Sequence, residues 1–308
     1  MKLAELHLHL DGSLRPETVA DLAAPLGLAV PPDLGFRPGM GLEAALSKFA
    51  FTLSLLQTPR AVRRVASEIC EDAARDGVER LEIRFAPQLH REAPVEAGVG
   101  TPPPIEAIVD AAVEGAAGRA GILLCGLYGE PPAQLERLVR VASTRPGVVG
   151  IDLAAGPLPT HAHRLPDYAP AFALARDLGL GRTVHAAEGR PPHEIRVAVE
   201  QLFAQRIGHG TTLLDDPAVV DLVVERGVTI EACPTSNVHT GVLDDVAHHP
   251  LPRWLALGVR ACVCADNPLL SQTTTAEEHR RVLGIPGMTQ ELLDRAVGHG
   301  HAAAFRRI

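Results

Sequence analysis

Four histidines and one aspartate stand where short apolar segments of the sequence end. His7 and His9 lie two residues apart in the first such segment, and His185, His209 and Asp266 follow later ones. Residues two apart in a strand face the same side, so His7 and His9 point together. Buried imidazoles and a buried carboxylate need partners, and one metal ion would satisfy all of them. Nitrogen and carboxylate ligands suit a borderline cation such as zinc, and we therefore predict a metal site.

The alternative is that these histidines are ordinary hydrogen-bonded residues, because the chain has 14 histidines and some must fall on strands by chance. A neighbouring carboxyl group argues against that alternative. Glu188 follows His185 by three residues and is a candidate general acid in a dry site. Taken alone, it could equally be a carboxylate in the first turn of a helix. Beside a metal ion that activates water, it indicates metal-assisted hydrolysis.

The elements that would position these residues alternate between strands and helices. Eight short runs rich in β-forming residues predict strands over 2–9, 80–86, 121–127, 148–154, 181–186, 206–209, 227–232 and 259–265. Helical segments are expected over 58–76, 132–142, 169–177, 192–202, 217–225 and 250–257. Such alternation predicts a parallel sheet, and eight repeats favour a closed (β/α)₈ TIM barrel over an open sheet. In that barrel the active site lies at the C-terminal strand ends, where the candidate residues stand.

Two segments interrupt the alternation within a single predicted domain, residues 1–308. Residues 29–50 follow the first helix and are expected to cap the barrel mouth. Residues 91–104 contain four prolines and are expected to form a loop.

Composition excludes several classes of protein. The net charge is −8 and no Lys/Arg-rich run is present, which argues against nucleic acid as a partner. No window approaches the roughly 20 apolar residues of a membrane span, and Glu5 and His7 break any leader-like start, so we expect a cytoplasmic protein without a membrane partner. The five cysteines do not predict a disulfide framework. Cys262 and Cys264 are expected to pack in the core, with a C-x-C metal pair as the alternative.

Five motifs in order resemble those of the adenosine deaminase family of the amidohydrolase superfamily. They are His7-x-His9-x-Asp11-Gly12-Ser13, His185-Ala186-Ala187-Glu188, Arg206-Ile207-Gly208-His209-Gly210, Cys233-Pro234-Thr235-Ser236-Asn237 and Ala265-Asp266-Asn267-Pro268. Weaker matches surround Phe49, Arg84 and Asp152. The resemblance extends from about residue 3 to about residue 280.

The resemblance implies a zinc-dependent hydrolytic deaminase of an aminopurine nucleoside. His7, His9, His185 and Asp266 would hold one Zn²⁺ per chain. His209 would orient the attacking water and help to deprotonate it, and Glu188 would protonate N1 of the purine ring. The substrate contacts implied by the same resemblance are Asp11, Phe49, Asp152, Ala155 and Asn267. Cys233 has no adjacent base in the sequence and is not expected to be a nucleophile.

The chain departs from the family pattern at four places. Asn267 replaces the second acid of Asp-Asp-Pro, Ala155 opens a sequence that replaces Gly-Asp-Glu, Tyr128-Gly129 replaces Arg-His, and Ala187 replaces the glycine of His-Ala-Gly-Glu. In the family the second acid bonds purine N7, and the glycine of Gly-Asp-Glu offers its N–H to purine N3. An asparagine amide can still donate to N7. The reaction is therefore better indicated than the substrate.

Adenosine is the default substrate, and a different 6-aminopurine nucleoside, such as aminodeoxyfutalosine or an intermediate of specialised nucleoside metabolism, is the main rival. A metal-dependent amide, lactone or ester hydrolase of the same superfamily would not need Glu188. A catalytically inactive nucleoside-binding protein would be expected to lose a ligand or the acid, and none is missing. No pattern in the sequence indicates an oligomeric state.

Overall fold

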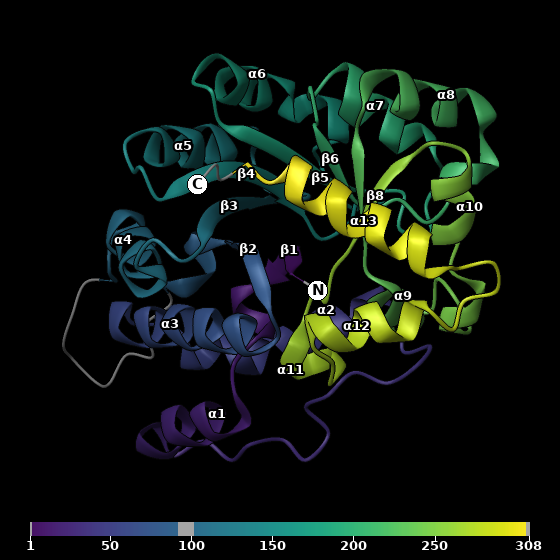
Figure 1. Cartoon of the computed structure of the whole chain (residues 1–308). Coiled ribbons are helices and arrows are strands. Elements are labelled where there is room, and N and C mark those ends of the chain that lie inside the picture. Colours follow the sequence, from purple (N-terminus) through teal and green to yellow (C-terminus); the bar gives the residue numbers. More distant parts are fainter. Residues whose placement is uncertain (1, 92–101, 306–308) are drawn as a thin grey trace.

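Eight parallel strands form the centre of the molecule, of which the computed structural model describes residues 2–91 and 102–305 (Figure 1). They are hydrogen-bonded in sequence order from β1 to β8. Their bounds are β1 (Leu3–His9), β2 (Val78–Phe85), β3 (Gly121–Leu127), β4 (Val148–Ala154), β5 (Gly181–Ala186), β6 (Arg206–His209), β7 (Thr229–Ala232) and β8 (Arg260–Val263). The predicted (β/α)₈ barrel is confirmed, and each predicted strand lies within two residues of the observed one.

The barrel closes between β8 and β1 at the candidate metal ligands. The backbone N–H of His9 donates to the carbonyl of Asp266, and the N–H of Asp266 donates to the carbonyl of His7, both at 2.9 Å. Leu8 and Asp266 form the bridge that results. The same few residues thus join the first and last strands and carry side chains into the barrel mouth.

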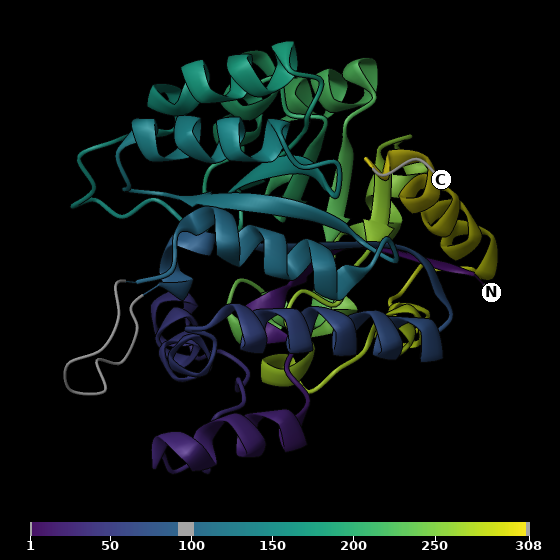
Figure 2. The same cartoon turned by 90° about the vertical axis from the view of Figure 1, so that its left-hand side faces the viewer.

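Helices cover the outside of the strands in both views (Figures 1 and 2). The longer ones are α1 (Pro16–Ala23), α2 (Leu42–Leu55), α3 (Pro59–Arg75), α4 (Ile105–Ala116), α5 (Pro132–Ser143), α6 (Ala169–Asp177), α7 (His193–Glu200), α8 (Pro217–Arg226), α12 (Thr275–Val282) and α13 (Gln290–Ala303). Two short helices, α9 (Pro234–His239) and α10 (Leu251–Ala256), lie between β7 and β8, and a third, α11 (Pro268–Ser271), follows β8. Several of the longer helices begin at a residue whose side chain caps the first turn. Thr58 accepts the N–H of Ala61 at α3, and Asp216 accepts that of Ala218 at α8.

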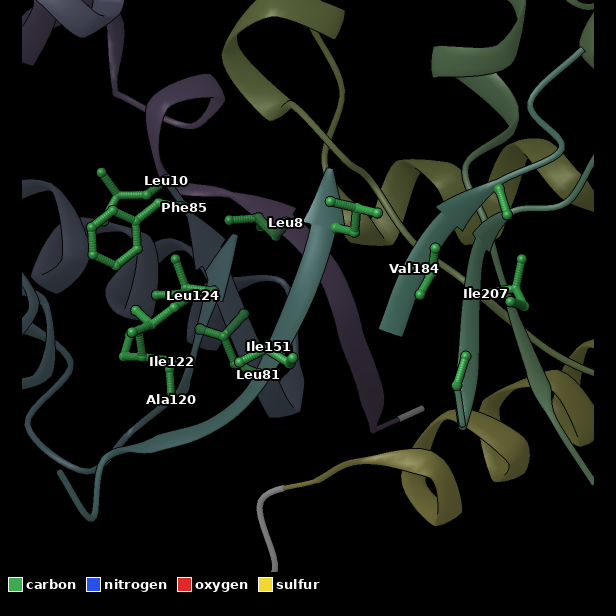
Figure 3. Close-up of a cluster of buried hydrophobic side chains, with 14 of the residues drawn as sticks. Leu8, Leu10, Leu81, Phe85, Ala120, Ile122, Leu124, Ile151, Val184 and Ile207 are labelled. Carbon is green, nitrogen blue, oxygen red and sulfur yellow. The ribbon is translucent and has the colours of Figure 1, made fainter. Parts of the chain in front are cut away.

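Strand side chains alternate between an apolar layer and a polar interior. Outward-facing residues pack under the helices, and Figure 3 shows Leu8, Leu81, Ile122, Val184 and Ile207 among them. Complete burial of each such side chain contributes roughly 1.5–3 kcal/mol of hydrophobic stabilisation. The alternate positions carry buried polar groups inside the barrel: Glu5, His7, Glu82, Arg84, Asp152, Thr183, His185, Arg206, Thr229 and Glu231. The interior is therefore built from hydrogen bonds and ion pairs.

Of the two segments expected to interrupt the alternation, the structure describes the first fully and the second only in part. Residues 29–50 comprise an irregular stretch followed by the first half of α2. Of the expected loop over 91–104, residues 92–101 lie outside the described part of the chain, and α4 begins at Ile105.

All five cysteines are free thiols and are buried. Among the described residues, no helix is both long and apolar enough to cross a membrane.

Candidate active site

Three histidines and one aspartate meet at the C-terminal ends of β1, β5 and β8. One ring nitrogen from each of His7, His9 and His185 lies within 4.8 Å of the others. His9 Nε2 and His185 Nε2 are 3.3 Å apart. Asp266 Oδ1 lies 3.5 Å from His7 Nε2 and 3.4 Å from His9 Nε2. The three histidines are thus close enough to share one ion, and Asp266 lies beside two of them.

The side chains themselves fit a divalent cation. His7 Nε2 is buried and has no hydrogen-bond partner, which is costly for a polar atom unless something else binds it. Three imidazoles and one carboxylate are a typical donor set for zinc. Cys233 also lies within 4.8 Å of ligand atoms of His7 and Asp266, but burial raises the pKa of its thiol well above the usual value.

A buried ionic network holds the two outer nitrogens of these histidines. His7 Nδ1 is 2.7 Å from Glu231 Oε2, and His185 Nδ1 is 3.0 Å from Asp152 Oδ2. Arg84 bridges the two carboxylates, donating to each at 2.8 Å. With Nδ1 engaged in this way, each ring turns its Nε2 toward the shared space. The network thereby sets the orientation of two of the four candidate ligands.

The network extends to the opposite end of the barrel through Arg206. Its guanidinium lies 2.7 Å from Glu231 and 2.6 Å from Glu82, and its carbon stands 3.7 Å from the ring centre of Phe305. Burial alone would raise the pKa of Glu231, but Arg84 and Arg206 hold it well below its usual range. The carboxylate is therefore ionised and able to accept from His7.

Asp152 lies in the barrel interior behind His185. The resemblance placed it among the substrate contacts, yet its side chain is fully buried inside the barrel and it is not among the residues that line the pocket. Its carboxylate is instead engaged by His185 and Arg84. Asp152 thus belongs to the network behind His185, and a direct contact with the substrate stays a prediction.

Glu188 and His209 stand together beside the candidate metal ligands. Glu188 Oε1 accepts from Asn237 Nδ2 at 3.3 Å and from Thr240 Oγ1 at 3.1 Å. Asn237 Nδ2 also lies 3.1 Å from His209 Nδ1, and the His209 ring centre is 4.9 Å from that of His7. Burial lowers the pKa of His209 to about 4. The sequence did not single out Asn237 or Thr240 as partners of the acid.

A cavity of ≈ 280 Å³ opens above these groups. Asp11, Phe49, Ala155 and Asn267, four of the five expected substrate contacts, line it together with His9, His185, Glu188, His209 and Asp266. Its remaining wall is largely apolar and includes Phe36, Leu42, Ala45, Leu46 and Leu53, most of them within or next to residues 29–50. Among the residues that the structure describes, no lysine or arginine lines this cavity.

Asp11 and Asn267 line the cavity, and each has one buried oxygen without a hydrogen-bond partner. Neither Asp11 Oδ1 nor Asn267 Oδ1 has a hydrogen-bond partner among the described residues. Burial raises the pKa of Asp11 to about 7. A methyl group at Gly12 would lie 2.0 Å from Asn267 Oδ1, so the glycine leaves the space that Asn267 occupies. Both side chains retain hydrogen-bonding capacity for a ligand.

Four residues at the strand ends adopt the left-handed conformation that glycine favours. They are Ala155 (φ 66°), Ala187 (φ 56°), His209 (φ 69°) and Asp266 (φ 62°). Two of them, Ala155 and Ala187, are departures from the family pattern at glycine positions. A side chain in this region costs roughly 1–2 kcal/mol relative to the right-handed one. Such strain concentrates at functional sites, where the surrounding structure maintains it.

The four departures therefore occupy two different environments. Asn267 and Ala155 line the cavity, whereas Tyr128 and Ala187 do not. Tyr128 is buried and donates its hydroxyl hydrogen to the carbonyl of His185 at 2.8 Å. Tyr128 and Ala187 are buried behind the end of β5.

Comparison with known proteins gives a consistent result. A family model described as adenosine deaminase matches residues 2–307. The adenosine deaminase of Klebsiella pneumoniae (strain 342) is 33% identical over 322 residues, covering 99% of this chain and 94% of its own length. That of Clostridium acetobutylicum is 32% identical, with 98% and 92% covered. Among solved structures, an adenine deaminase from Arthrobacter aurescens superposes with a TM-score of 0.86 at 25% identity, covering 99% of this chain and 94% of that one.

Proposed function

The chain belongs to the adenosine deaminase family, and we propose that it is a zinc-dependent enzyme that removes the 6-amino group of adenosine or a related 6-aminopurine nucleoside by hydrolysis. The observation that carries this proposal is the joint presence of the His7, His9, His185 and Asp266 cluster and of Glu188 on one cavity. A deaminase needs both an activated water and a proton donor for the ring. A hydrolase of amides or lactones has no ring nitrogen to protonate.

His7, His9, His185 and Asp266 would hold the zinc ion. When bound, the ion supplies Lewis acidity that lowers the pKa of water and makes it a nucleophile near neutral pH. The remaining steps depend on the chain's own side chains. The ionic network behind His7 and His185 keeps two of the four ligands oriented before any ion arrives.

Glu188 is proposed as the general acid. Asn237 and Thr240 hydrogen-bond the same oxygen, Oε1, which fixes the carboxyl group and leaves Oε2 to face the substrate. Its proton passes to the ring nitrogen next to the amino-bearing carbon, and that carbon becomes electrophilic. His209 orients the attacking water and accepts one of its protons. The water oxygen bonds to the ring carbon, and His209 passes the proton it accepted to the amino group. The carbon–nitrogen bond then breaks, ammonia leaves, and the added hydroxyl returns its proton to Glu188 as the carbonyl forms.

The substrate is proposed to carry no phosphate. In the described part of the chain, the charged side chains that line the cavity, apart from the histidines, are Asp11, Glu188 and Asp266. No lysine or arginine of that part is placed to pair with a phosphate group. The apolar wall formed by residues of α2 suits a planar heterocycle instead. Asp11 would accept a ribose hydroxyl, and Phe49 would cover the ring.

A second candidate substrate is favoured by Asn267 and Ala155. Both line the cavity, and both differ from the usual family residues at positions that contact the purine edge. Asn267 can donate to a ring nitrogen without being protonated, whereas an aspartate must be protonated to do so. A 6-aminopurine nucleoside other than adenosine, including aminodeoxyfutalosine, is therefore the alternative within the same reaction.

Metal analysis combined with ammonia release tests the proposal. The purified chain is expected to contain about one zinc per chain and to release ammonia from at least one 6-aminopurine nucleoside, but not from the matching 5′-monophosphate. Zinc without ammonia from any purine nucleoside would support an amide or lactone hydrolase. A chain that neither binds zinc nor releases ammonia would contradict the catalytic role altogether.

A further inference from the structure

A second, larger depression lies at the opposite end of the barrel from the active-site cavity. It encloses ≈ 1080 Å³ and is lined by the first residues of β5, β7 and β8, by the connections that precede them, and by residues 302–305 at the end of α13. Figures 1 and 2 show α13 lying across this N-terminal end of the strands, beside the chain's N-terminus. We name this depression the basal pocket.

The basal pocket is strongly basic in a chain that is otherwise acidic. Arg176, Arg182, Arg226 and Arg260 line it, and within residues 2–91 and 102–305 no aspartate or glutamate does. The chain as a whole carries a net charge of −8. Four guanidinium groups around one depression repel each other, so their gathering needs a compensating charge.

The arginines differ in how they are held. Arg182 is anchored, because its Nε donates to the carbonyl of Phe203 at 2.9 Å and its Nη1 to that of Leu180 at 2.7 Å. Arg226 and Arg260 are exposed, and among the described residues neither forms an ion pair. Arg176 pairs at 2.9 Å with Asp177, which lies outside the pocket. Two guanidinium groups are thus available to a ligand.

Phe203 adds an aromatic face to the same wall. The Arg176 guanidinium carbon stands 4.3 Å from the centre of its ring. Phe203 has a φ of 54°, a left-handed conformation that is unusual for an aromatic residue. That backbone turns the Phe203 carbonyl to Arg182 and the ring to Arg176, so one strained residue organises two of the four arginines.

Helix electrostatics explain only part of this arrangement. Arg176 and Arg226 lie in the last turns of α6 and α8, where positive charge stabilises the helix. Arg182 and Arg260 lie on strands β5 and β8, where that explanation does not apply.

We propose that the basal pocket binds an anion with two or more phosphate groups, held by the guanidinium groups of Arg226 and Arg260 beside the anchored Arg182. Arginine is suited to this because its planar fork donates two parallel hydrogen bonds to phosphate oxygens.

Calorimetric titration of the zinc-loaded chain tests the proposal with two probes, inorganic tripolyphosphate and uridine triphosphate. Uridine triphosphate has no 6-aminopurine ring and is not a substrate of the proposed reaction. We expect at least one probe to bind with a Kd well below 1 mM. Binding of that probe should weaken about tenfold or more when Arg226→Gln and Arg260→Gln are combined, because two charge-assisted contacts are removed.

A matched pair of arginines on other faces provides the control. Arg60 and Arg253 are also exposed, lie outside the pocket, and form no ion pair among the described residues. Combining Arg60→Gln with Arg253→Gln changes the net charge equally and should alter the affinity less than about twofold. Absence of binding by the unmodified chain, or equal weakening in both double variants, would overturn the proposal.

Phe203→Leu then distinguishes the two sources of phosphate. If the substitution weakens uridine triphosphate but not tripolyphosphate, the aromatic face takes part and the ligand is a nucleotide. If it changes neither affinity, the pocket recognises the phosphate chain alone. Both results are consistent with the proposal, and their difference identifies the ligand class.

Discussion

The floor and the mouth of the active-site cavity are built on different principles. The floor, formed by His7, His185, Asp152, Glu231 and Arg84, is buried, and both of its carboxylates are engaged by Arg84 and by a histidine. Its unpartnered atoms among the described residues are His7 Nε2 and Arg84 Nε, both nitrogens. The mouth, formed by Asp11, Phe49, Ala155 and Asn267 with the apolar side chains of α2, leaves polar oxygens without partners. The departures from the family pattern that touch the cavity, Ala155 and Asn267, both belong to the mouth.

The difference follows from what each region must do. A buried carboxylate or guanidinium that loses its partner is left as an uncompensated charge, so the floor tolerates little change. A side chain in the mouth exchanges its contacts with water for contacts with a ligand, and its replacement alters which ligand fits. We therefore propose that the floor determines the reaction, which is shared with the family, and that the mouth determines which substrate binds.

The largest expected effect comes from replacing Glu188, the proposed proton donor, which lies between the floor and the mouth. Glu188→Gln keeps the shape and the contacts with Asn237 and Thr240 but cannot transfer a proton. We expect kcat to fall by about 10²- to 10⁴-fold while zinc content is unchanged. Steady-state ammonia release and metal analysis on the same preparation check this. Near-normal turnover would show that Glu188 is not the acid.

Thr240→Val is the graded control for that substitution. Thr240 donates to Glu188 Oε1 at 3.1 Å, and Asn237 donates to the same oxygen. The variant removes one of two contacts and leaves the acid in place, so kcat should fall much less than in Glu188→Gln. Equal losses in the two variants would indicate that positioning, and not proton transfer, limits the reaction.

A smaller effect is expected within the floor. Glu231→Gln removes the charge that Arg84, Arg206 and His7 share, and Gln cannot match the carboxylate as an acceptor of all three. Partners behind a metal ligand typically contribute 10- to 100-fold in metal affinity. We expect zinc affinity, measured by chelator competition, to fall by about that range with the zinc-loaded kcat less affected.

Thr183→Val tests whether that loss is specific to the ion pairs. Thr183 Oγ1 donates to Glu231 Oε1 at 3.1 Å, so the variant perturbs the same carboxylate without changing its charge. Zinc affinity should change by less than in Glu231→Gln. If Glu231→Gln unfolds the chain, chelator competition on Thr183→Val still reports the direction of the effect.

The sequence predicted the barrel well because each strand carries its own signal. Short runs rich in β-forming residues placed every strand to within two residues, and the two-residue spacing of His7 and His9 indicated that they share a face. The network behind them was not predicted. Arg84 and Glu231 are 147 residues apart in sequence. Arg84 shares its predicted strand with two other charged residues, and Glu231 is the one charged residue of β7. The usable signal was that charge, since a buried charge requires a buried partner.

The sequence also did not indicate how far a side chain lies from the C-terminal end of its strand. Asp152 was expected at the substrate and lies inside the barrel, although its strand was predicted with the correct bounds. Helix α13 was also missed. It contains Gly298 and Gly300, which lower helix propensity, yet a methyl group at Gly300 would lie 3.0 Å from the Cβ of Ala4. Close packing against β1 requires that glycine and outweighs its propensity.

Within the mouth, Asn267→Asp is expected to shift substrate preference. The acid must be protonated to donate to a purine nitrogen, whereas the amide donates at any pH. If position 267 selects the heterocycle, the ratio of kcat/KM for adenosine to that for the preferred nucleoside should change about tenfold, the equivalent of one hydrogen bond. Thermal unfolding of the same variant serves as the stability control. An unchanged ratio would remove Asn267 from the set of selective residues.

The smallest expected effect separates strain from recognition at two left-handed alanines. Ala155→Gly and Ala187→Gly each relieve a positive φ, so each should raise the free energy of unfolding by up to about 1 kcal/mol. Because Ala155 lines the cavity and Ala187 does not, only Ala155→Gly should also change KM across a panel of purine nucleosides. Denaturant unfolding and steady-state kinetics on both variants make the comparison. Equal changes in KM would mean that the strand-end backbone, and not the Ala155 methyl group, shapes the mouth.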